Sequence, residues 1–222
     1  MITTLFFDLD GTLTDSQEGI TKSVAYALRT VCGMEITDLN TLTCYIGPPL
    51  VDGFMENHHL DRQTAERCKD AYRDRYQDTG LFQNKVYPDI TEVLTMLKHQ
   101  GFTLCVATSK PEKFAVQILE HFKLAQYFTV ISGASMNGTI STKGEVIANT
   151  IRRIGNPTPS EILMIGDRSH DILGAHMYGI RAIGVLYGFG SREEFEKAQA
   201  DAIAPQVRDL PQVIAQFQNN IV

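Results

Sequence analysis

Five short apolar segments recur along this chain of 222 residues and constrain its fold more than any other feature. They read ITTLFFD at 2–8, FTLCVAT at 102–108, YFTVIS at 127–132, EILMIGD at 161–167 and IRAIGVL at 180–186. Helix-like stretches lie between most of them, and strands that alternate with helices indicate βαβ units. Each segment is continuously apolar, as is typical of strands covered on both faces. The pattern therefore predicts an α/β fold with a parallel sheet.

Residues 15–84 interrupt this alternation. The segment DSQEGITKSVAYALRTV, residues 15–31, reads as a capping box followed by apolar residues at helical spacing. A second helix is predicted over Asp61–Tyr76, and no strong strand pattern appears before residue 85. We therefore expect an α/β core made of residues 1–14 and 85–222, with an all-helical cap domain of residues 15–84 inserted into it.

Charge and cysteine content exclude several classes of protein. The formal net charge is −6, which disfavours broad binding to the backbone of a nucleic acid. No stretch approaches the ~18–20 apolar residues of a membrane span, and the N-terminus lacks a signal peptide pattern. The four cysteines form no C-x-x-C pair, so the sequence predicts neither a zinc site nor a redox motif. We expect a cytoplasmic protein with no nucleic-acid or membrane partner.

Acidic and hydroxyl side chains gather where three of the apolar segments end. They are Asp8 and Asp10 after the first, Thr108 and Ser109 after the second, and Asp167 and Asp171 after the fourth. In open α/β sheets the carboxyl ends of the strands border one crevice, which is where ligands bind. Carboxylates crowded there repel one another unless a cation compensates them. Because Mg²⁺ takes hard oxygen ligands, the pattern predicts a magnesium site.

Three further features each allow a structural interpretation. Ser109-Lys110-Pro111-Glu112 is a plausible capping box, which is compatible with anion binding at a helix start. Thr142-x-x-Glu145 is another, and it places Lys143 in the first helical turn, where the helix dipole disfavours a cation. We favour a functional lysine over a solvated one. The glycine pattern YGFGS at 187–191 is interpreted as a turn that borders the crevice.

Four of these motifs, taken in order, resemble those of the haloacid dehalogenase superfamily of phosphotransferases. They are DLDGT at 8–12, ATSK at 107–110, the downstream Lys143, and GDRSHD at 166–171. The resemblance covers essentially the whole chain, including the helical insert. It implies a Rossmann-like core with a small helical cap.

The resemblance also implies roles for the acidic residues. Asp8 is expected to be the nucleophile that accepts the phosphoryl group, and Asp10 the general acid and then the general base. Mg²⁺ is expected on Asp8, on the backbone carbonyl of Asp10 and on Asp167. Asp171 is expected to lie behind these ligands or to pair with Lys143.

The remaining implied roles concern phosphate and substrate. Thr108 and Lys143 are expected to hold the phosphate oxygens, and Ser109 is a further candidate. Catalysis of phosphoryl transfer is mostly positioning and electrostatics, which suits a lysine and a metal ion. A stiff apolar cap loop, Ile46 to Leu50, is a candidate substrate loop through Gly47, Pro48 and Pro49.

Departures from other branches of the superfamily narrow the expected chemistry. Dehalogenases carry a tyrosine where this chain has Asp10. Ion pumps of the superfamily carry a lysine in the first motif and also contain membrane spans. A β-phosphoglucomutase usually has a cap histidine, absent from residues 15–30. Phosphonoacetaldehyde hydrolases need a cap lysine, and neither Lys22 nor Lys69 stands out. The best match is a phosphoglycolate phosphatase-like enzyme.

Several alternatives stay open at this point. A 5′-nucleotidase or a pyrophosphatase has similar motifs, and a β-phosphoglucomutase-like phosphotransferase or a non-enzymatic binding protein fits less well. We expect Mg²⁺-dependent hydrolysis of a small phosphorylated metabolite. The sequence does not identify that metabolite or the oligomeric state.

Overall fold

The computed structural model describes residues 1–219, which divide into two compact units. The core unit consists of Met1–Thr14 and the chain from Val86 onward, and the helical unit is Asp15–Lys85. Two short strands, β2 (Thr14–Asp15) and β3 (Lys85–Val86), pair with each other where the chain leaves and re-enters the core unit.

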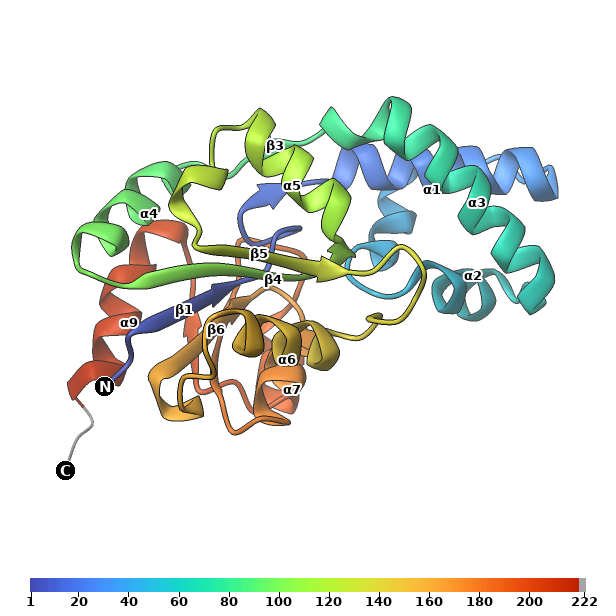
Figure 1. The fold of residues 1–222 in the computed structure, drawn as a ribbon. Coiled ribbons are helices and arrows are strands. Elements are labelled where there is room, and N and C mark those ends of the chain that lie inside the picture. The colour runs from blue at the N-terminus through green and yellow to red at the C-terminus, as the bar shows by residue number, and fades with distance from the viewer. Residues whose placement is uncertain (220–222) are drawn as a thin grey trace. The chain divides into compact units, whose positions relative to one another are not determined.

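The core unit contains a six-stranded parallel sheet with the strand order β5-β4-β1-β6-β7-β8 (Figure 1). Its strands are β1 (Thr4–Phe7), β4 (Thr103–Pro111), β5 (Val130–Ala134), β6 (Ile162–Gly166), β7 (Arg181–Val185) and β8 (Ala202–Ala204). The parallel α/β prediction is confirmed, and five of these strands overlap the five apolar segments, although β4 and β5 extend beyond theirs. The sixth, β8, was not predicted.

Helices cover both faces of this sheet. They are α4 (Ile90–His99), α5 (Glu112–His121), α6 (Lys143–Arg153), α7 (Ser169–His176), α8 (Arg192–Lys197) and α9 (Leu210–Asn219). In Figure 1, α6 and α7 lie on one side of the sheet and α5 lies on the other. Short 3₁₀ helices, η3 (Ala125–Tyr127), η4 (Pro159–Glu161) and η5 (Val207–Asp209), complete the connections. Two-sided cover explains why the strands are apolar throughout.

Side chains beneath α6 and α7 form a continuous core. Phe6 of β1 and Met164 of β6 are completely buried with Ile147 of α6 and Ile172 of α7. At about 1.5–3 kcal/mol for each fully buried large apolar side chain, this layer holds the strand ends in fixed positions. The acidic and hydroxyl residues that follow these strands extend from those ends.

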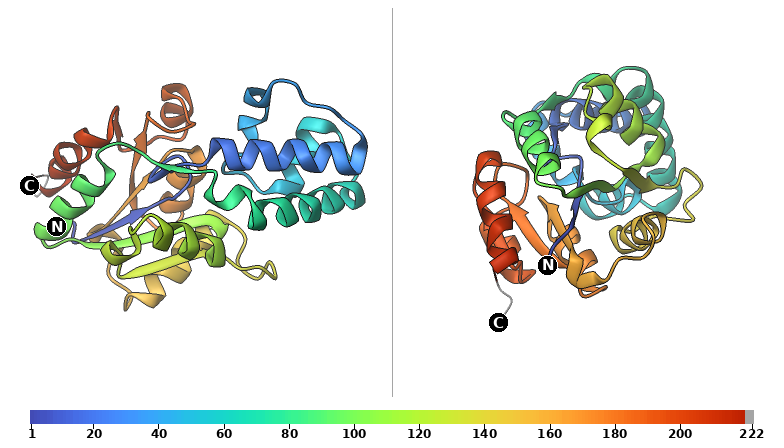
Figure 2. Two further views of the ribbon diagram at one scale, coloured as in Figure 1. Left: turned by 90° about the horizontal axis from the view of Figure 1, so that it is seen from above. Right: turned by 60° about the vertical axis from the view of Figure 1, so that its left-hand side comes forward.

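The helical unit packs α1 (Gln17–Cys32) against α3 (Arg62–Asp78). The two helices run side by side in the left-hand view of Figure 2. The other elements are η1 (Leu39–Tyr45), α2 (Leu50–His58) and η2 (Gly80–Phe82). The predicted helix over Asp61–Tyr76 corresponds to α3, where Asp61 caps the first turn by accepting the Thr64 backbone N–H at 2.9 Å. Among the described residues, no helix has the length and apolar character needed to cross a membrane.

Two of the predicted capping boxes are wrong. At α1, Ser16 makes no side-chain capping bond, and the Gln17 backbone N–H donates to the Asp15 carboxylate at 3.1 Å. At α5, strand β4 continues through Pro111, so the helix begins only at Glu112. The Glu112 carboxylate accepts a backbone N–H of β5 instead of capping its own helix. In both cases an acidic side chain of the expected capping box accepts a different backbone N–H.

Candidate active site

The strand order brings the predicted site residues to one edge of the sheet. Strand β1 lies between β4 and β6, with Phe7 opposite Val106 on one side and Ile165 on the other. The Asp8 backbone N–H continues this pattern by donating to the Ile165 carbonyl at 2.9 Å. Asp8 therefore follows β1 at the level where β6 also reaches its carboxyl end, beside β4, which continues to Pro111. This is the crevice position expected for a ligand site.

Three buried carboxylates meet there around one lysine. Asp8, Asp167 and Asp171 each place a carboxylate oxygen within 4.8 Å of the other two. The Lys143 Nζ lies 2.8 Å from Asp8 Oδ1 and 2.6 Å from Asp171 Oδ1. It also donates to the Ala107 carbonyl of β4 at 3.0 Å. Asp171 pairs with Lys143, which was one of the two positions expected for this acid, and the lysine joins Asp8 after β1, Ala107 in β4 and Asp171 at the start of α7.

The start of α6 fixes this lysine. The predicted capping box is present: the Thr142 hydroxyl accepts the Glu145 backbone N–H at 3.3 Å, and the Glu145 carboxylate accepts the Thr142 backbone N–H at 2.9 Å. A side chain at Gly174 of α7 would lie 2.8 Å from Lys143 Cγ, so the glycine leaves room for the lysine stem. Lys143 thus extends from the first turn of α6 to the carboxylates. A lysine at a helix start is usually exposed to solvent, but only 5% of this side chain is exposed.

Charge in this cluster is unevenly compensated. Burial, with repulsion from Asp171 and Asp8, raises the pKa of Asp167 well above its ordinary value. Burial and Asp8 also raise the pKa of Asp171, to about 6, although Lys143 acts in the opposite direction. For Lys143 burial opposes the charge, but Asp171 and Asp8 outweigh it and raise its pKa. One ammonium cannot neutralise three carboxylates.

The residues present fit a divalent cation. Asp167 is fully buried, and its Oδ1 has no hydrogen-bond partner among residues 1–219. A buried carboxylate oxygen without a donor costs free energy unless a cation binds it. The carboxylate oxygens of Asp8, Asp167 and Asp171 are ligands that suit a hard ion such as Mg²⁺, which keeps several waters.

The Asp10 carboxylate pairs with a second lysine. Asp10 Oδ2 lies 2.7 Å from Lys110 Nζ, and the two side chains are only 11% and 5% exposed. Thr108 is buried too, and its hydroxyl accepts the Lys110 backbone N–H at 3.2 Å. Ser109 lies half-buried between them in β4. Lys110 lies within the ATSK motif, but no role was predicted for it. Its position offered a signal: Thr108 and Lys110 lie two apart in one strand, and residues two apart on a strand share a face.

The YGFGS turn holds Asp167 in place. The Phe189 backbone N–H donates to Asp167 Oδ2 at 2.9 Å, and the Tyr187 hydroxyl donates to the Thr12 carbonyl at 3.1 Å. A Cβ at Gly188 would lie 2.4 Å from the Asp167 Cβ, so only glycine fits this close approach. The predicted turn beside the crevice is therefore confirmed, and it also orients a carboxylate.

The entry to α7 explains the second acid of GDRSHD. The Asp171 Oδ2 accepts the Arg168 backbone N–H at 3.0 Å, so Asp171, rather than Asp167, caps this helix. From α8, Glu194 accepts the Ser169 backbone N–H at 2.6 Å and pairs with the Arg168 guanidinium at 3.1 Å. Sequence reasoning missed Glu194. These bonds fix the loop that carries both acids.

The candidate substrate loop lies in the other unit. Gly47, Pro48 and Pro49 connect η1 to α2, and Gly47 has a φ of 105°, which favours glycine. Their role toward substrate stays a prediction.

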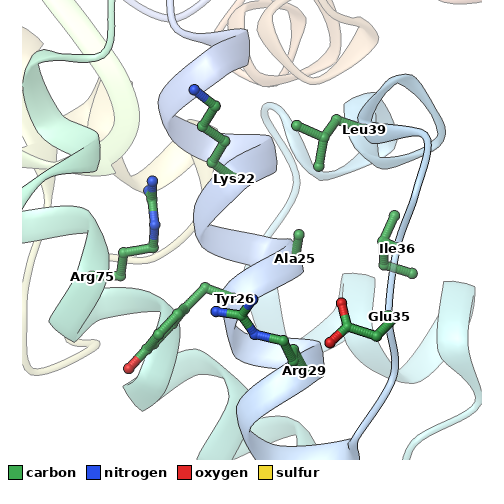
Figure 3. A pocket seen from close by; sticks show the side chains of 8 residues that line it. All are labelled: Lys22, Ala25, Tyr26, Arg29, Glu35, Ile36, Leu39 and Arg75. Atoms are coloured by element: carbon green, nitrogen blue, oxygen red, sulfur yellow. The ribbon is translucent and has the colours of Figure 1, made fainter.

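A pocket in the helical unit contains none of the predicted site residues (Figure 3). Its lining residues are Lys22, Ala25, Tyr26, Arg29, Glu35, Ile36, Leu39 and Arg75. Lys22 pairs with Glu18 at 2.7 Å, and Arg75 donates to the Ser23 hydroxyl at 2.9 Å. Internal contacts thus already use part of its positive charge, and we assign it no ligand.

Comparisons with known proteins agree with this geometry. The family model described as "Haloacid dehalogenase-like hydrolase" matches residues 5–185. A 5′-nucleotidase of Pseudomonas aeruginosa is 43% identical over 95% of this chain and 94% of its own. A phosphoglycolate phosphatase of Vibrio vulnificus is 30% identical over 94% of each chain. A crystal structure from Clostridium acetobutylicum, described as a predicted phosphatase, has a TM-score of 0.93, with 46% identity over 97% of this chain and 100% of that one.

Proposed function

The chain belongs to the haloacid dehalogenase-like hydrolases and is a phosphatase of that family, and we propose that it hydrolyses small phosphorylated metabolites through a phosphoryl-enzyme on Asp8. The observation that carries this proposal is the buried contact of Asp8 and Asp171 with Lys143, beside Asp167, at the end of the first strand. A carboxylate nucleophile needs nearby positive charge, because its target is also anionic.

In the first half-reaction, the Asp8 carboxylate attacks the phosphorus of the substrate ester. A bond forms between Asp8 and phosphorus, and the bond from phosphorus to the ester oxygen breaks. Asp10 gives a proton to that oxygen, so an alcohol leaves. Lys143 and Thr108 stabilise the charge that spreads over the phosphoryl oxygens.

In the second half-reaction, a water molecule attacks the phosphorus of the phosphoryl-enzyme. The water gives a proton to Asp10, which is now the base, and the bond from phosphorus to Asp8 breaks. Inorganic phosphate leaves, and the Asp8 carboxylate is restored. Over the cycle one ester and one water become one alcohol and one phosphate, with Asp10 returned to its starting protonation state.

We assign Mg²⁺ to this site, held by Asp8, Asp167 and the backbone carbonyl of Asp10. When bound, the ion neutralises phosphate charge and draws electron density from the phosphoryl group. Asp171 lies close enough to pair with Lys143 and so maintains the lysine's orientation. The Phe189 backbone N–H, which donates to Asp167, likewise maintains the orientation of that carboxylate.

Two substrate classes are candidates for this phosphatase. The motif pattern favours phosphoglycolate-like small acids, whereas the Pseudomonas relative at 43% identity is named a 5′-nucleotidase. The Vibrio phosphoglycolate phosphatase is less similar, at 30% identity. We therefore place nucleoside 5′-monophosphates beside phosphoglycolate as the first substrates to examine. A cytoplasmic location, which the cysteine pattern favours, stays a prediction.

The test is a substrate screen of the purified chain. Phosphate release is measured for phosphoglycolate, nucleoside 5′-monophosphates, sugar phosphates and pyrophosphate, with Mg²⁺ or with EDTA. We expect Mg²⁺-dependent release from at least one class, and loss of that release in Asp8→Asn. A protein that releases no phosphate from any member, or that works equally in EDTA, contradicts the proposal.

A further inference from the structure

We propose that Lys110 is a positioning residue for Asp10, holding its carboxylate so that one oxygen is committed to the lysine and the other is presented for proton transfer. The inference rests on the proposed function, in which Asp10 moves the proton. It starts from the contact of Lys110 Nζ with Asp10 Oδ2 at 2.7 Å.

The two oxygens of Asp10 have different surroundings. Oδ2 contacts Lys110, whereas Oδ1 is buried and has no hydrogen-bond partner among residues 1–219. A buried carboxylate oxygen normally has a donor, so one without a protein donor suits a proton carried by a ligand or by water. The asymmetry gives the carboxylate a defined direction.

The two buried lysines of the site divide the acids between them. Lys143 contacts Asp8 and Asp171, whereas Lys110 contacts Asp10. The nucleophile and the proton-transfer acid therefore contact different lysines.

The backbone around Lys110 is itself held in place. The ladder between β4 and β5 shifts register between Thr108 and Pro111, and the Lys110 backbone N–H donates to the Thr108 hydroxyl at 3.2 Å. A Cβ at Gly133 of β5 would lie 2.5 Å from the Lys110 carbonyl oxygen, so the two backbones approach closely. A lysine on such a fixed segment has few alternative positions. Misplacing a reacting group by about 1 Å can cost about 10²-fold in rate.

The experiment compares esters that differ in their need for a proton. An alkyl phosphate needs protonation of its leaving oxygen, whereas an aryl phosphate with an acidic phenol needs little. We expect Lys110→Met to lower kcat about 10²-fold for the alkyl ester, with KM changed less than about threefold, and to affect the aryl ester far less. Lys110→Arg, which keeps the charge but has a planar head, is expected to recover part of the loss. Lys113→Met, at an exposed lysine of α5, is the matched control.

A double variant separates positioning from a general structural effect. If Lys110 acts through Asp10, adding Lys110→Met to Asp10→Asn causes no further loss beyond about twofold. Full additivity overturns the inference, as does an equal loss on both esters. A raised KM with unchanged kcat also overturns it, since Lys110 would then bind substrate. These outcomes all presuppose an active wild-type enzyme, so wild-type inactivity on both esters indicates failure of the proposed function instead.

A structural measurement tests the inference without any turnover. In a crystal structure of Lys110→Met, we expect the Asp10 carboxylate to leave its wild-type orientation while the backbone from Thr108 to Pro111 stays in place. An unchanged Asp10 orientation overturns the positioning role, whatever the kinetics show.

Discussion

The acid cluster predicts that Mg²⁺ stabilises the protein more strongly as pH rises. Burial and Asp8 raise the pKa of Asp171 from an ordinary 3.8 to about 6. At about 1.4 kcal/mol per pKa unit, this difference corresponds to about 3 kcal/mol. Asp167 shifts in the same direction, for the same physical reason.

The sign of the effect follows from proton binding. Between pH 3.8 and 6 the unfolded chain has already lost the Asp171 proton, whereas the folded protein still holds it. The folded state binds more protons, so the free energy of unfolding falls as pH rises. The stabilising contribution is complete below pH ~4 and is lost above pH ~6, which leaves the metal-free protein about 3 kcal/mol less stable. If Mg²⁺ binds as proposed, we expect it to compensate the ionised carboxylates and to restore the lost stability.

The assay is thermal unfolding from pH 4.5 to 7.5, in Mg²⁺ and in EDTA. About 2 of the 3 kcal/mol is lost between pH 4.5 and 7.5, since the loss begins near pH 4. For a chain of this size about 1 kcal/mol shifts Tm by about 2–4 °C, so the Mg²⁺-induced shift should grow by about 4–8 °C over this range. Groups outside the three-carboxylate cluster, such as Glu145 with a pKa lowered to about 2 by the Ser141 and Thr142 backbone N–H groups, cancel in this comparison. Asp171→Asn should flatten the pH dependence, and the exposed Glu193→Gln should not. An equal Mg²⁺ shift at every pH would refute the reasoning.

Three further predictions address the lysine, the turn and the candidate substrate loop. Lys143→Ala should lower kcat about 10²–10³-fold, as for loss of one preorganised charge-stabilising group, measured by phosphate release. Gly188→Ala should weaken Mg²⁺ affinity about 10–100-fold, measured by titration calorimetry, because the added methyl displaces Asp167. Changing Pro48→Ala together with Leu50→Ala should reorder the preferred small substrates, measured as kcat/KM, while activity on a minimal aryl phosphate falls much less.

Each of these has its own control. Lys197→Ala, at an exposed lysine of α8, should leave the rate unchanged. Wild-type activity in Lys143→Ala would show that Lys143 has no part in catalysis. Gly138→Ala, at a glycine with open space around it, should not change Mg²⁺ affinity. Normal affinity in Gly188→Ala would remove the turn from metal binding. An unchanged substrate ranking, or a deep loss on every substrate alike, would remove the apolar loop from a selective role.

The core and much of the candidate site could be predicted because their signals are local. Continuous apolar runs identified the strands, and the polar residues that follow them had to lie at one edge of a parallel sheet. Lys143 was recognisable because a cation at a helix start opposes the dipole. Its pairing with Asp171 was one of the two positions that the family resemblance implied for that acid, whereas its contact with Asp8 was not predicted.

Contacts between distant segments could not be predicted in the same way. The spacing of Lys110 from Thr108 suggests a shared face of β4, but it does not identify Asp10, on another segment, as the partner of the lysine. Strand β4 also continues through Pro111, which removes the capping box expected at Ser109. Glu194 accepts the backbone N–H of Ser169, 25 positions earlier in the sequence, and no local pattern predicts a contact at that separation.

Trapping the covalent intermediate tests the central claim most directly. The enzyme is mixed with a ³²P-labelled substrate from the screen, quenched in acid within one turnover, and digested for peptide mapping. We predict a label on the N-terminal peptide at Asp8 that hydroxylamine releases, and neither label nor turnover in Asp8→Asn. Turnover at the wild-type rate by Asp8→Asn, or a label mapped to another residue, would contradict the account.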